Sequence, residues 1–407
     1  MLNMKAIGNY IFCGSHTLGV MQSGYTIDRI LEISDEIKQT NCYHFVRNFP
    51  NIPIILPSEW KSEGYVDTLA KNGEYDLFFA NNPCSGLSRI NINASADNDV
   101  NHYFYDVINN IRKIKPKRFL MENAPTLVTT GFSILKDIAD LLGPDYYINI
   151  MNDNAGNHNV PMIRPRTIIT GYRKDIYKGA PLYNPDKQPM TTVKDAIGDL
   201  YDDNFAKTIN NTDDYIGHYA ETLKPYYDRV KPLQTVMGML VENPQYDDEL
   251  PLDWQRVRLK HFRDKLSEGK GYWDKFPKRL AENHTAPSLT SASLLIHPIH
   301  NRDLNIREYA RLMGYPDSFK FYTEEDGCKI SPIQCIAQGV PVNFIKYVVG
   351  QMHCAVEGNL PIFENTNFVY QKNQTGTYMT SDIFDESLLI SKYNIADKFS
   401  KKRKRLF

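Results

Sequence analysis

The sequence predicts an α/β protein with a doubly wound, mostly parallel sheet and a second, smaller domain. Three observations lead to this prediction. Short apolar runs alternate with helix-like stretches over roughly the first 175 residues, which is typical of parallel strands joined by helices. Between about 187 and 285 the alternation is lost and the chain becomes rich in Asp, Tyr, Lys and Pro. Helical spacing then returns after residue 300.

The expected elements follow one another in a regular order. In the helix that begins at Phe104, the residues Phe104, Val107, Ile108 and Ile111 recur on one face, and Pro116 ends it. The last 45 or so residues are polar and weakly patterned. Strands are predicted at Ile7–Phe12, Ile27–Ile33, Tyr75–Ala80, Arg118–Met121, Tyr146–Met151 and Thr167–Tyr172, and helices at 17–23, Phe104–Ile114, Ile134–Leu142, Asn305–Met313 and Phe344–Met352.

Composition argues against several classes of protein. With 407 residues, 42% of them hydrophobic and 23% charged, the chain can bury a sizeable core. No apolar run approaches the ~18 residues that span a bilayer, and the N-terminus lacks the pattern of an export signal. Six scattered cysteines without a CxxC pair indicate neither a disulfide framework nor a zinc site, so no metal is expected. A cytoplasmic protein with no membrane partner is therefore predicted.

The net charge of −1 argues against a uniformly basic surface, although local patches can still bind phosphate. Two basic segments stand out. Each is open to two interpretations, because a solvated helix face or a disordered tail has the same composition as a phosphate-binding surface. The first segment holds Arg256, Arg258, Lys260, Arg263 and Lys265 interleaved with Trp254, His261 and Phe262, and the second is the run 401–405.

Two reactive side chains are expected at the carboxyl ends of predicted strands, where ligands bind in open α/β sheets. Pro83 fixes its own φ and would hold Cys84 rigidly where the strand Tyr75–Ala80 gives way to a loop. Glu122 ends the next apolar strand. A structural cysteine and a surface glutamate are the alternatives, but at these positions the thiol and the carboxyl group would share one cleft.

Arg164 and Arg166 stand two residues apart, so in an extended segment both side chains point to one face. An exposed basic strand edge is the alternative interpretation of this pair. Together with Cys84 and Glu122 they suit covalent addition to an electron-poor heterocycle. The thiolate would attack, the protonated carboxyl group would neutralise the developing negative charge, and the guanidinium groups would anchor the ring and nearby phosphate.

Four motifs resemble those of the cytosine-5 DNA methyltransferases, in the same order and at the same spacings. The similarity covers about residues 5 to 175 and 285 to 352. Each motif is short, but four in sequence are highly specific. They are Pro83-Cys84, Glu122-Asn123-Ala124-Pro125, Arg164-Pro165-Arg166 and the stretch Leu304–Phe319, which reads LNIREYARLMGYPDSF.

The resemblance implies a Rossmann-like, S-adenosylmethionine-dependent methyltransferase fold and methyl transfer to C5 of cytosine in double-stranded DNA. In such a reaction Cys84 adds to C6 of a flipped-out base, and Glu122 holds and protonates N3. Arg164 and Arg166 match the arginine pair that supports the base and the active-site loop. The segment after Cys84, about 85 to 102, would be the mobile loop that closes over DNA.

The same resemblance divides the chain into functional parts. Residues 1–186 would form the first part of the catalytic domain, 187–285 the target-recognition domain and 286–358 the return of the catalytic domain. Residues 359–407 would form a polar C-terminal extension with a basic tail. A role in restriction-modification or viral self-protection is implied, with a cognate restriction nuclease as a candidate partner, and an oligomer is not required.

The cofactor residues match the family less closely. Phe12 and Gly14 correspond to the start of its glycine-rich turn, but Ser15-His16-Thr17 replaces a longer turn with two more glycines. Glu32 corresponds to the acid that holds the ribose hydroxyls. Because of the departures, a modified sulfonium donor is the alternative to S-adenosylmethionine, and His16 is interpreted as a turn histidine bonded to backbone. The remaining residues assigned to the cofactor site are Ile33, Pro83, Tyr103, Gln338, Gly339 and Val340.

Other functions stay open at this point. An RNA cytosine-5 methyltransferase is one, although the large insert 187–285 favours duplex DNA because reading base edges in a groove needs a separate surface. A catalytically silent relative that binds DNA is another, against which the retention of Cys84, Glu122 and both arginines argues. A nicotinamide-dependent oxidoreductase is disfavoured because GxGxxG is absent after the first strand.

Overall fold

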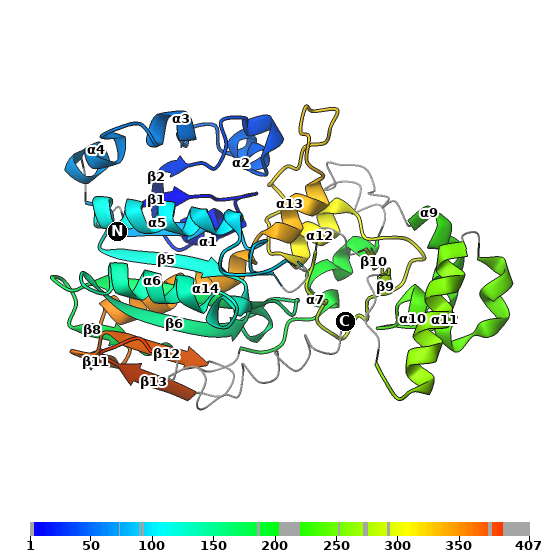
Figure 1. Ribbon diagram of the computed structural model, residues 1–407. Helices are drawn as coiled ribbons and strands as arrows, with labels where there is room; N and C mark the ends of the chain where they lie inside the picture. Colours follow the sequence, from blue (N-terminus) through cyan, green and yellow to red (C-terminus); the bar gives the residue numbers. More distant parts are fainter. Residues whose placement is uncertain are drawn as a thin grey trace. The chain divides into compact units, whose positions relative to one another are not determined.

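The computed structural model describes residues 4–72, 74–88, 91, 93–184, 188–202, 220–250, 253–271, 276–290, 294–372 and 377–385. The backbone divides into two compact units, and Figure 1 labels most of their helices and strands. Unit 1 comprises Met1–Asn159, Arg164–Pro189 and Val340–Phe407, and unit 2 comprises Val160–Ile163 and Met190–Gly339. The division into catalytic and target-recognition parts at residues 187 and 285 stays a prediction.

A large mixed sheet organises unit 1. Strands β3, β2, β1, β4 and β5 are mutually parallel, whereas β7 runs antiparallel between β5 and β6. The expected doubly wound, mostly parallel sheet is thus confirmed. Across the described residues the order is β13 (Thr377–Ser381), β12 (Phe368–Lys372), β6 (Tyr146–Asn154), β7 (Pro165–Arg173), β5 (Arg118–Asn123), β4 (Leu77–Asn81), β1 (Met4–Asn9), β2 (Tyr25–Leu31) and β3 (Ile54–Ile55).

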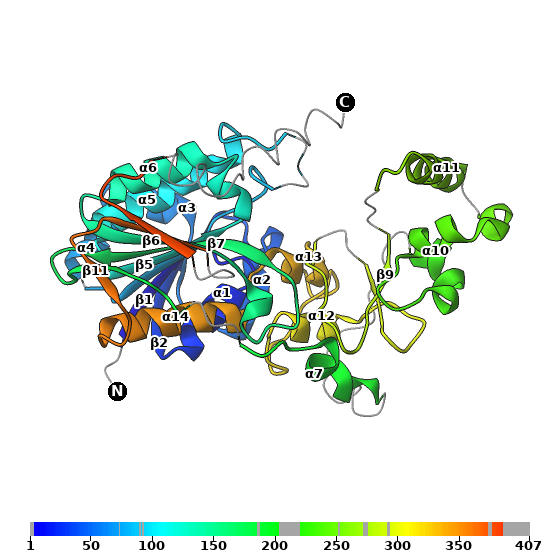
Figure 2. The same cartoon turned by 90° about the horizontal axis from the view of Figure 1, so that it is seen from below.

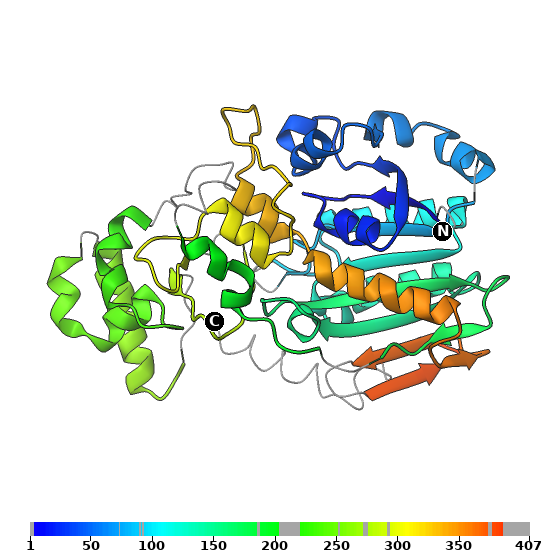
Figure 3. The ribbon, with the colours of Figure 1, turned by 180° about the vertical axis from the view of Figure 1, so that it is seen from behind.

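Helices cover both faces of this sheet. Figure 2 shows α5 (His102–Ile114) and α6 (Phe132–Leu142) on one face and α1 (Ser15–Gln22) and α14 (Val342–Val356) on the other. Figure 3 shows α14 running along the second face. Around the sheet lie α2 (Cys42–Asn48), α3 (Pro57–Trp60), α4 (Tyr65–Asn72) and the small pair β8 (Gly179–Pro181) and β11 (Ile362–Glu364).

Helices α1 and α14 approach closely because a glycine lies between them. A Cβ atom on Gly19 would stand 2.6 Å from Cβ of Ile345, closer than real side-chain contacts allow. On the opposite face Val107, Ile111 and Leu135 are fully buried in the core that covers β4. Each such side chain stabilises the fold by about 1.5–3 kcal/mol relative to its exposed state.

Apart from small shifts at the ends of elements, such as β2 ending at Leu31 and not at Ile33, two stretches differ from the sequence prediction. The first strand ends at Asn9, so the expected Ile7–Phe12 is three residues too long at this end. Tyr10 and Phe12 have φ values of 58° and 48°, which no strand accommodates. Strands β12 and β13 were not predicted from the weakly patterned C-terminal residues. Residues 368–371 are all buried, so this strand lacks the alternation of a half-exposed one.

Unit 2 is mainly helical. Its hydrophobic core holds Met237 and Leu240 of α10 and Leu259 and Phe262 of α11, although no clear period was found in this part of the sequence. None of the helices in the described ranges is both long and apolar enough to cross a bilayer. The elements are α7 (Val193–Ile197), α9 (Ala220–Leu223), α10 (Val236–Glu242), α11 (Asp253–Ser267), α12 (Ile306–Leu312), α13 (Pro332–Gln338) and the parallel pair β9 (Lys278–Arg279) and β10 (Leu295–Ile296).

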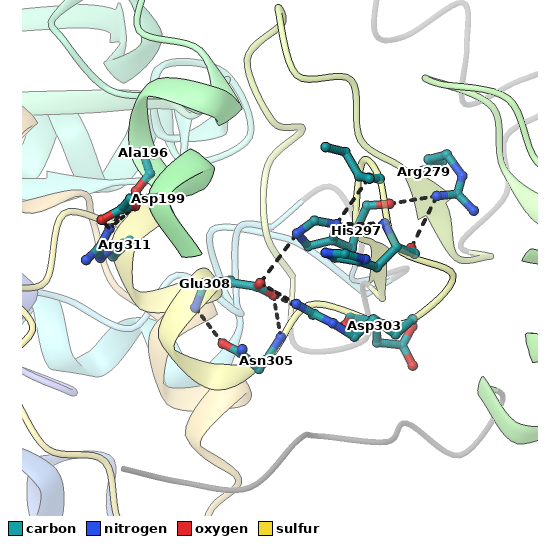
Figure 4. Close-up of polar contacts among 11 residues, drawn as sticks. Ala196, Asp199, Arg279, His297, Asp303, Asn305, Glu308 and Arg311 are labelled. Atoms are coloured by element: carbon teal, nitrogen blue, oxygen red, sulfur yellow. Dashed lines mark hydrogen bonds and ion pairs between the residues drawn. The ribbon is translucent and has the colours of Figure 1, made fainter. Parts of the chain in front are cut away.

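A buried ionic network anchors α12, which carries the longest sequence motif (Figure 4). Glu308 has no exposed surface and accepts hydrogen bonds from both terminal nitrogens of Arg302, at 2.9 and 2.7 Å. Asn305 and Glu308 form a capping box at the start of the helix. Arg311 pairs with Asp199 of unit 2. The polar residues of this motif therefore hold the fold of unit 2 together.

Candidate active site

Cys84 lies just beyond the carboxyl end of β4, in a loop that side-chain amides hold in place. The Nδ2 atom of Asn82 donates to the carbonyl oxygen of Tyr103 (3.1 Å), and Nδ2 of Asn123 donates to that of Asn82 (3.2 Å). The thiol is half-buried rather than packed in the core. Burial raises its pKa, and the guanidinium group of Arg166 opposes this effect. Cys84 is therefore a rigidly placed thiol beside a cation.

Glu122 lies beside this loop, on β5. Asn81, the last residue of β4, is its partner in the parallel register. The Glu122 side chain is 4% exposed, and its Oε2 atom lies 3.3 Å from Nε of Arg166. Burial raises the pKa of Glu122 despite the nearby guanidinium groups of Arg166 and Arg164. A raised pKa favours a protonated carboxyl group, which can donate a proton or a hydrogen bond.

Arg164 and Arg166 are brought to the same place by the turn between β6 and β7. The backbone N–H of Arg164 donates to Oδ1 of Asn154 at 2.7 Å, and the N–H of Ala155 donates to the Arg164 carbonyl oxygen at 3.1 Å. The Arg164 residue is 2% exposed and the Arg166 side chain 13%. The interpretation of this pair as an exposed basic edge is therefore wrong. Both guanidinium charges act on the Cys84 thiol.

Glu32 follows β2 and is almost completely buried. Its Oε1 atom accepts a hydrogen bond from the N–H of Ile33 (2.7 Å), and the buried thiol of Cys42 also acts on the carboxyl group. The Oε2 atom is buried with no direct hydrogen-bond partner among the described residues. Burial raises the pKa of Glu32 to about 7. A buried acceptor oxygen without a donor is costly, so this carboxyl group suits a ligand that brings hydroxyl groups.

The turn between β1 and α1 requires a glycine. Gly14 has φ of 86°, and a Cβ atom there would stand 2.3 Å from Cδ2 of Phe45. The next residue, Ser15, accepts a hydrogen bond from the N–H of Val340 at 3.2 Å. Phe12 and Val340 thus both lie within unit 1 near this turn. Gln338 is the last residue of α13 and Gly339 follows it, and both belong to unit 2.

His16, the second residue of α1, differs from the sequence interpretation as a turn histidine. His16 is fully buried, and neither ring nitrogen has a hydrogen-bond partner in the part of the chain that the structure describes. The expected bond to backbone is therefore not formed. The ring instead lies 5.4 Å from that of Phe79, and burial lowers the pKa of His16 to about 3. The imidazole is consequently neutral.

No supporting role was predicted for three asparagines of the site, although Asn123 belongs to the motif Glu122-Asn123-Ala124-Pro125. Asn82 and Asn123 hold the Cys84 loop, and Asn154 holds the backbone of Arg164. Each lies at or just past the end of a strand. An amide side chain at a strand end is a recognisable signal, because Asn readily bonds to nearby backbone groups in turns.

Comparisons with known proteins match this chain to methyltransferases. A family model described as C-5 cytosine-specific DNA methylase matches residues 11–354. The type II methyltransferase M.XorII of Xanthomonas oryzae pv. oryzae is 28% identical over 86% of this chain and 84% of its own. M.DdeI of Desulfomicrobium norvegicum is 21% identical over 91% and 92%. Among solved structures, a proposed DNA modification methyltransferase from an E. coli prophage shares the fold, with a TM-score of 0.59, 19% identity and coverage of 87% and 100%.

Proposed function

This chain belongs to the C-5 cytosine-specific DNA methylase family, and on that premise we propose that Cys84 is its nucleophile and S-adenosylmethionine its methyl donor. The proposal rests on one observation: a thiol, a buried carboxyl group and two arginines lie close together at one end of the sheet. Cys84, Glu122, Arg164 and Arg166 come from three separate segments, and their charges act on one another.

Each group suits one step of addition to cytosine. The Cys84 thiolate forms a bond to C6, and the electron pair of the C5–C6 double bond moves toward N3 and C5. Glu122 donates its proton to N3, which its raised pKa favours. Arg166 stabilises the thiolate before attack and the Glu122 carboxylate after proton transfer. C5 then takes the methyl group that the bound donor would supply. Loss of the C5 proton to a base, return of the N3 proton to Glu122 and elimination of Cys84 from C6 restore the C5–C6 double bond and free the methylated product.

The donor site is proposed around Glu32, Phe12 and Gly14. When bound, S-adenosylmethionine would supply the methyl group from its sulfonium centre. The unpartnered Oε2 atom of Glu32 fits the ribose hydroxyls, and the glycine turn brings backbone close to the ligand. Ile33, Pro83, Tyr103 and Val340 of unit 1 are proposed with them, and the assignment of Gln338 and Gly339, which belong to unit 2, rests on the resemblance alone.

Duplex DNA is the proposed substrate, with the recognition surface in residues 187–285. A base must leave the stack before Cys84 can reach C6, and a separate surface must read the grooves. Relatives named type II methyltransferases support a place in restriction-modification. We accordingly propose a cytoplasmic enzyme that acts without an obligatory oligomer and alongside a cognate nuclease.

The test is nucleoside mass spectrometry of duplex DNA incubated with the purified protein and S-adenosylmethionine. We expect 5-methylcytosine with the intact protein and none with Cys84→Ala. Cys354→Ala, which removes the other half-buried thiol, is the matched control and should behave like the intact protein. Product formed by Cys84→Ala at an undiminished rate would overturn the covalent mechanism. Product on RNA alone, or none on any substrate, would overturn the proposed substrate and donor.

A further inference from the structure

A buried histidine–aspartate pair lies beside the arginines and has no part in the mechanism above. Asp153 is on β6, and His158 follows the 3-10 helix η4 (Ala155–Asn157). Their side chains are 0% and 1% exposed, and Nε2 of His158 is hydrogen-bonded to Oδ2 of Asp153. The other carboxylate oxygen accepts from the N–H of Asn154 (2.7 Å) and from Nδ2 of Asn157 (3.0 Å). Both oxygens of Asp153 are thus engaged.

The imidazole ring of His158 is fixed by stacking. It lies parallel to the ring of Tyr347 on α14, with centroids 3.7 Å apart and an interplanar angle of 17°. The Tyr347 hydroxyl group donates to the carbonyl oxygen of Asn184 at 2.7 Å. Phe344 packs near the same ring at 5.7 Å. His158 therefore cannot swing away from Asp153 without losing this stack.

Asp153 is also the direct neighbour of Arg166 across the sheet. The two residues are partners in the antiparallel register of β6 and β7, so their side chains lie on the same face with Cβ atoms about 4.5–5.5 Å apart. Glu122 is on this face too, because its register partner is Ile168, two residues along β7 from Arg166. One guanidinium group therefore has two carboxyl groups within reach.

Of these two carboxyl groups, Arg166 pairs with Glu122, at 3.3 Å, and not with Asp153. We propose that His158 is a positioning residue, which holds the Asp153 carboxylate and so leaves Arg166 for Glu122 and Cys84. This inference rests on the proposed roles of Cys84 and Glu122. A buried carboxylate oxygen that loses its hydrogen-bond donor is destabilised. Without His158, the Asp153 carboxylate would draw Arg166 across the sheet, and the thiol would lose its cation.

Two variants separate positioning from packing. His158→Phe keeps an aromatic ring on Tyr347 but removes the hydrogen bond to Asp153. The double variant Asp153→Asn, His158→Phe also removes the competing charge. If His158 acts by holding Asp153, adding Asp153→Asn must restore the Cys84 reactivity that His158→Phe alone loses. If His158 only fills space, the double variant must be at least as impaired as His158→Phe.

The first readout is independent of catalysis. Alkylation of Cys84 by iodoacetamide is followed by peptide mass spectrometry between pH 6 and pH 9, a range chosen around an ordinary thiol pKa of about 8.5. Arg166, Arg164 and Glu122 are the charged groups that act on this thiol. We expect His158→Phe to slow alkylation at pH 7 about tenfold, which corresponds to one unit in the thiol pKa. The double variant should return to within about threefold of the intact protein.

The second readout is steady-state kinetics with duplex DNA. His158→Phe should lower kcat about tenfold or more with little change in KM, because the loss is in the reaction and not in binding. Asp153→Asn alone should stay close to the intact protein. An unaltered alkylation profile in His158→Phe, or a double variant that is not rescued, would overturn the inference. If the intact protein methylates nothing, the proposed function fails, and the alkylation profiles still decide whether His158 positions Asp153.

Discussion

The Nε atom of Arg166 lies 3.3 Å from Oε2 of Glu122, across the pairing of β5 with β7. Burial raises the pKa of Glu122, and this guanidinium group limits the rise. The carboxyl group can therefore give up a proton and be stabilised once it has done so. Such a balance between burial and a nearby charge is how proteins tune a general acid.

Replacing Glu122 by Gln should lower the rate of methyl transfer about 10²- to 10⁴-fold, the usual contribution of a positioned acid. DNA affinity should change little, because the amide keeps the size of the side chain. Single-turnover transfer of labelled methyl groups and a DNA-binding titration measure the two quantities. An unchanged rate would show that Glu122 does not donate a proton to N3.

Donor affinity should depend on pH through Glu32. Burial raises the pKa of this carboxyl group to about 7 in the free protein, and hydroxyl donors favour its charged form. Binding should therefore release a proton, and affinity for S-adenosylmethionine should weaken as pH falls below about 7 and level off above it. Calorimetry in two buffers of different ionisation enthalpy measures this. Glu32→Gln is the control, and an intact protein with the same affinity at pH 6 and pH 8 would contradict the prediction.

The basic segment of α11 divides into two kinds of residue. Arg256 donates to the carbonyl oxygen of Leu250 at 2.6 Å, and Arg263 pairs with Asp247, so both brace unit 2. Arg258 and Lys260 are exposed. The run 401–405 lies outside the described residues.

Neutralising Arg258 and Lys260 together by Gln should reduce the slope of log affinity against log salt by up to about 1.8 if each meets a phosphate, since each contact contributes about 0.9. Fluorescence anisotropy on duplex DNA gives the slope. The control is Lys270→Gln, which removes an exposed charge that is paired with Glu268. An unchanged slope would show that Arg258 and Lys260 face solvent and do not contact phosphate.

Strand β12 makes the C-terminal part integral to unit 1. Phe368 is 7% exposed, packs on Phe384 at 5.6 Å and lies in the core. Phe368→Ala should cost about 3–5 kcal/mol in the free energy of unfolding, as measured by chemical denaturation. Ile383→Ala, at a side chain 75% exposed, should cost under about 0.5 kcal/mol. Equal stability of the two variants would show that β12 is dispensable.

The sequence determined much of unit 1 because its signals are local. A proline before Cys84 and an apolar run before Glu122 mark strand ends, and parallel strands bring such ends to the same edge of the sheet. The register that pairs Asn81 with Glu122 is a finding of the tertiary structure. The unpredicted β12 has no such local signal, since its residues are buried on both faces. It forms a strand because its backbone pairs in parallel with an edge of β6, about 220 residues earlier in the chain.

The sequence by itself therefore determined the family and the mostly parallel sheet, and it singled out the proposed reactive groups, because these inferences depend on residue type and spacing along the chain. Only the tertiary structure decided which carboxyl group Arg166 meets, since Asp153 and Glu122 reach it from different strands. It also decided that His16 has no backbone partner and that Glu32 keeps one oxygen unpaired among the described residues. These outcomes depend on distances and burial between segments remote in sequence, where electrostatic and hydrogen-bond energies are set by the surrounding protein.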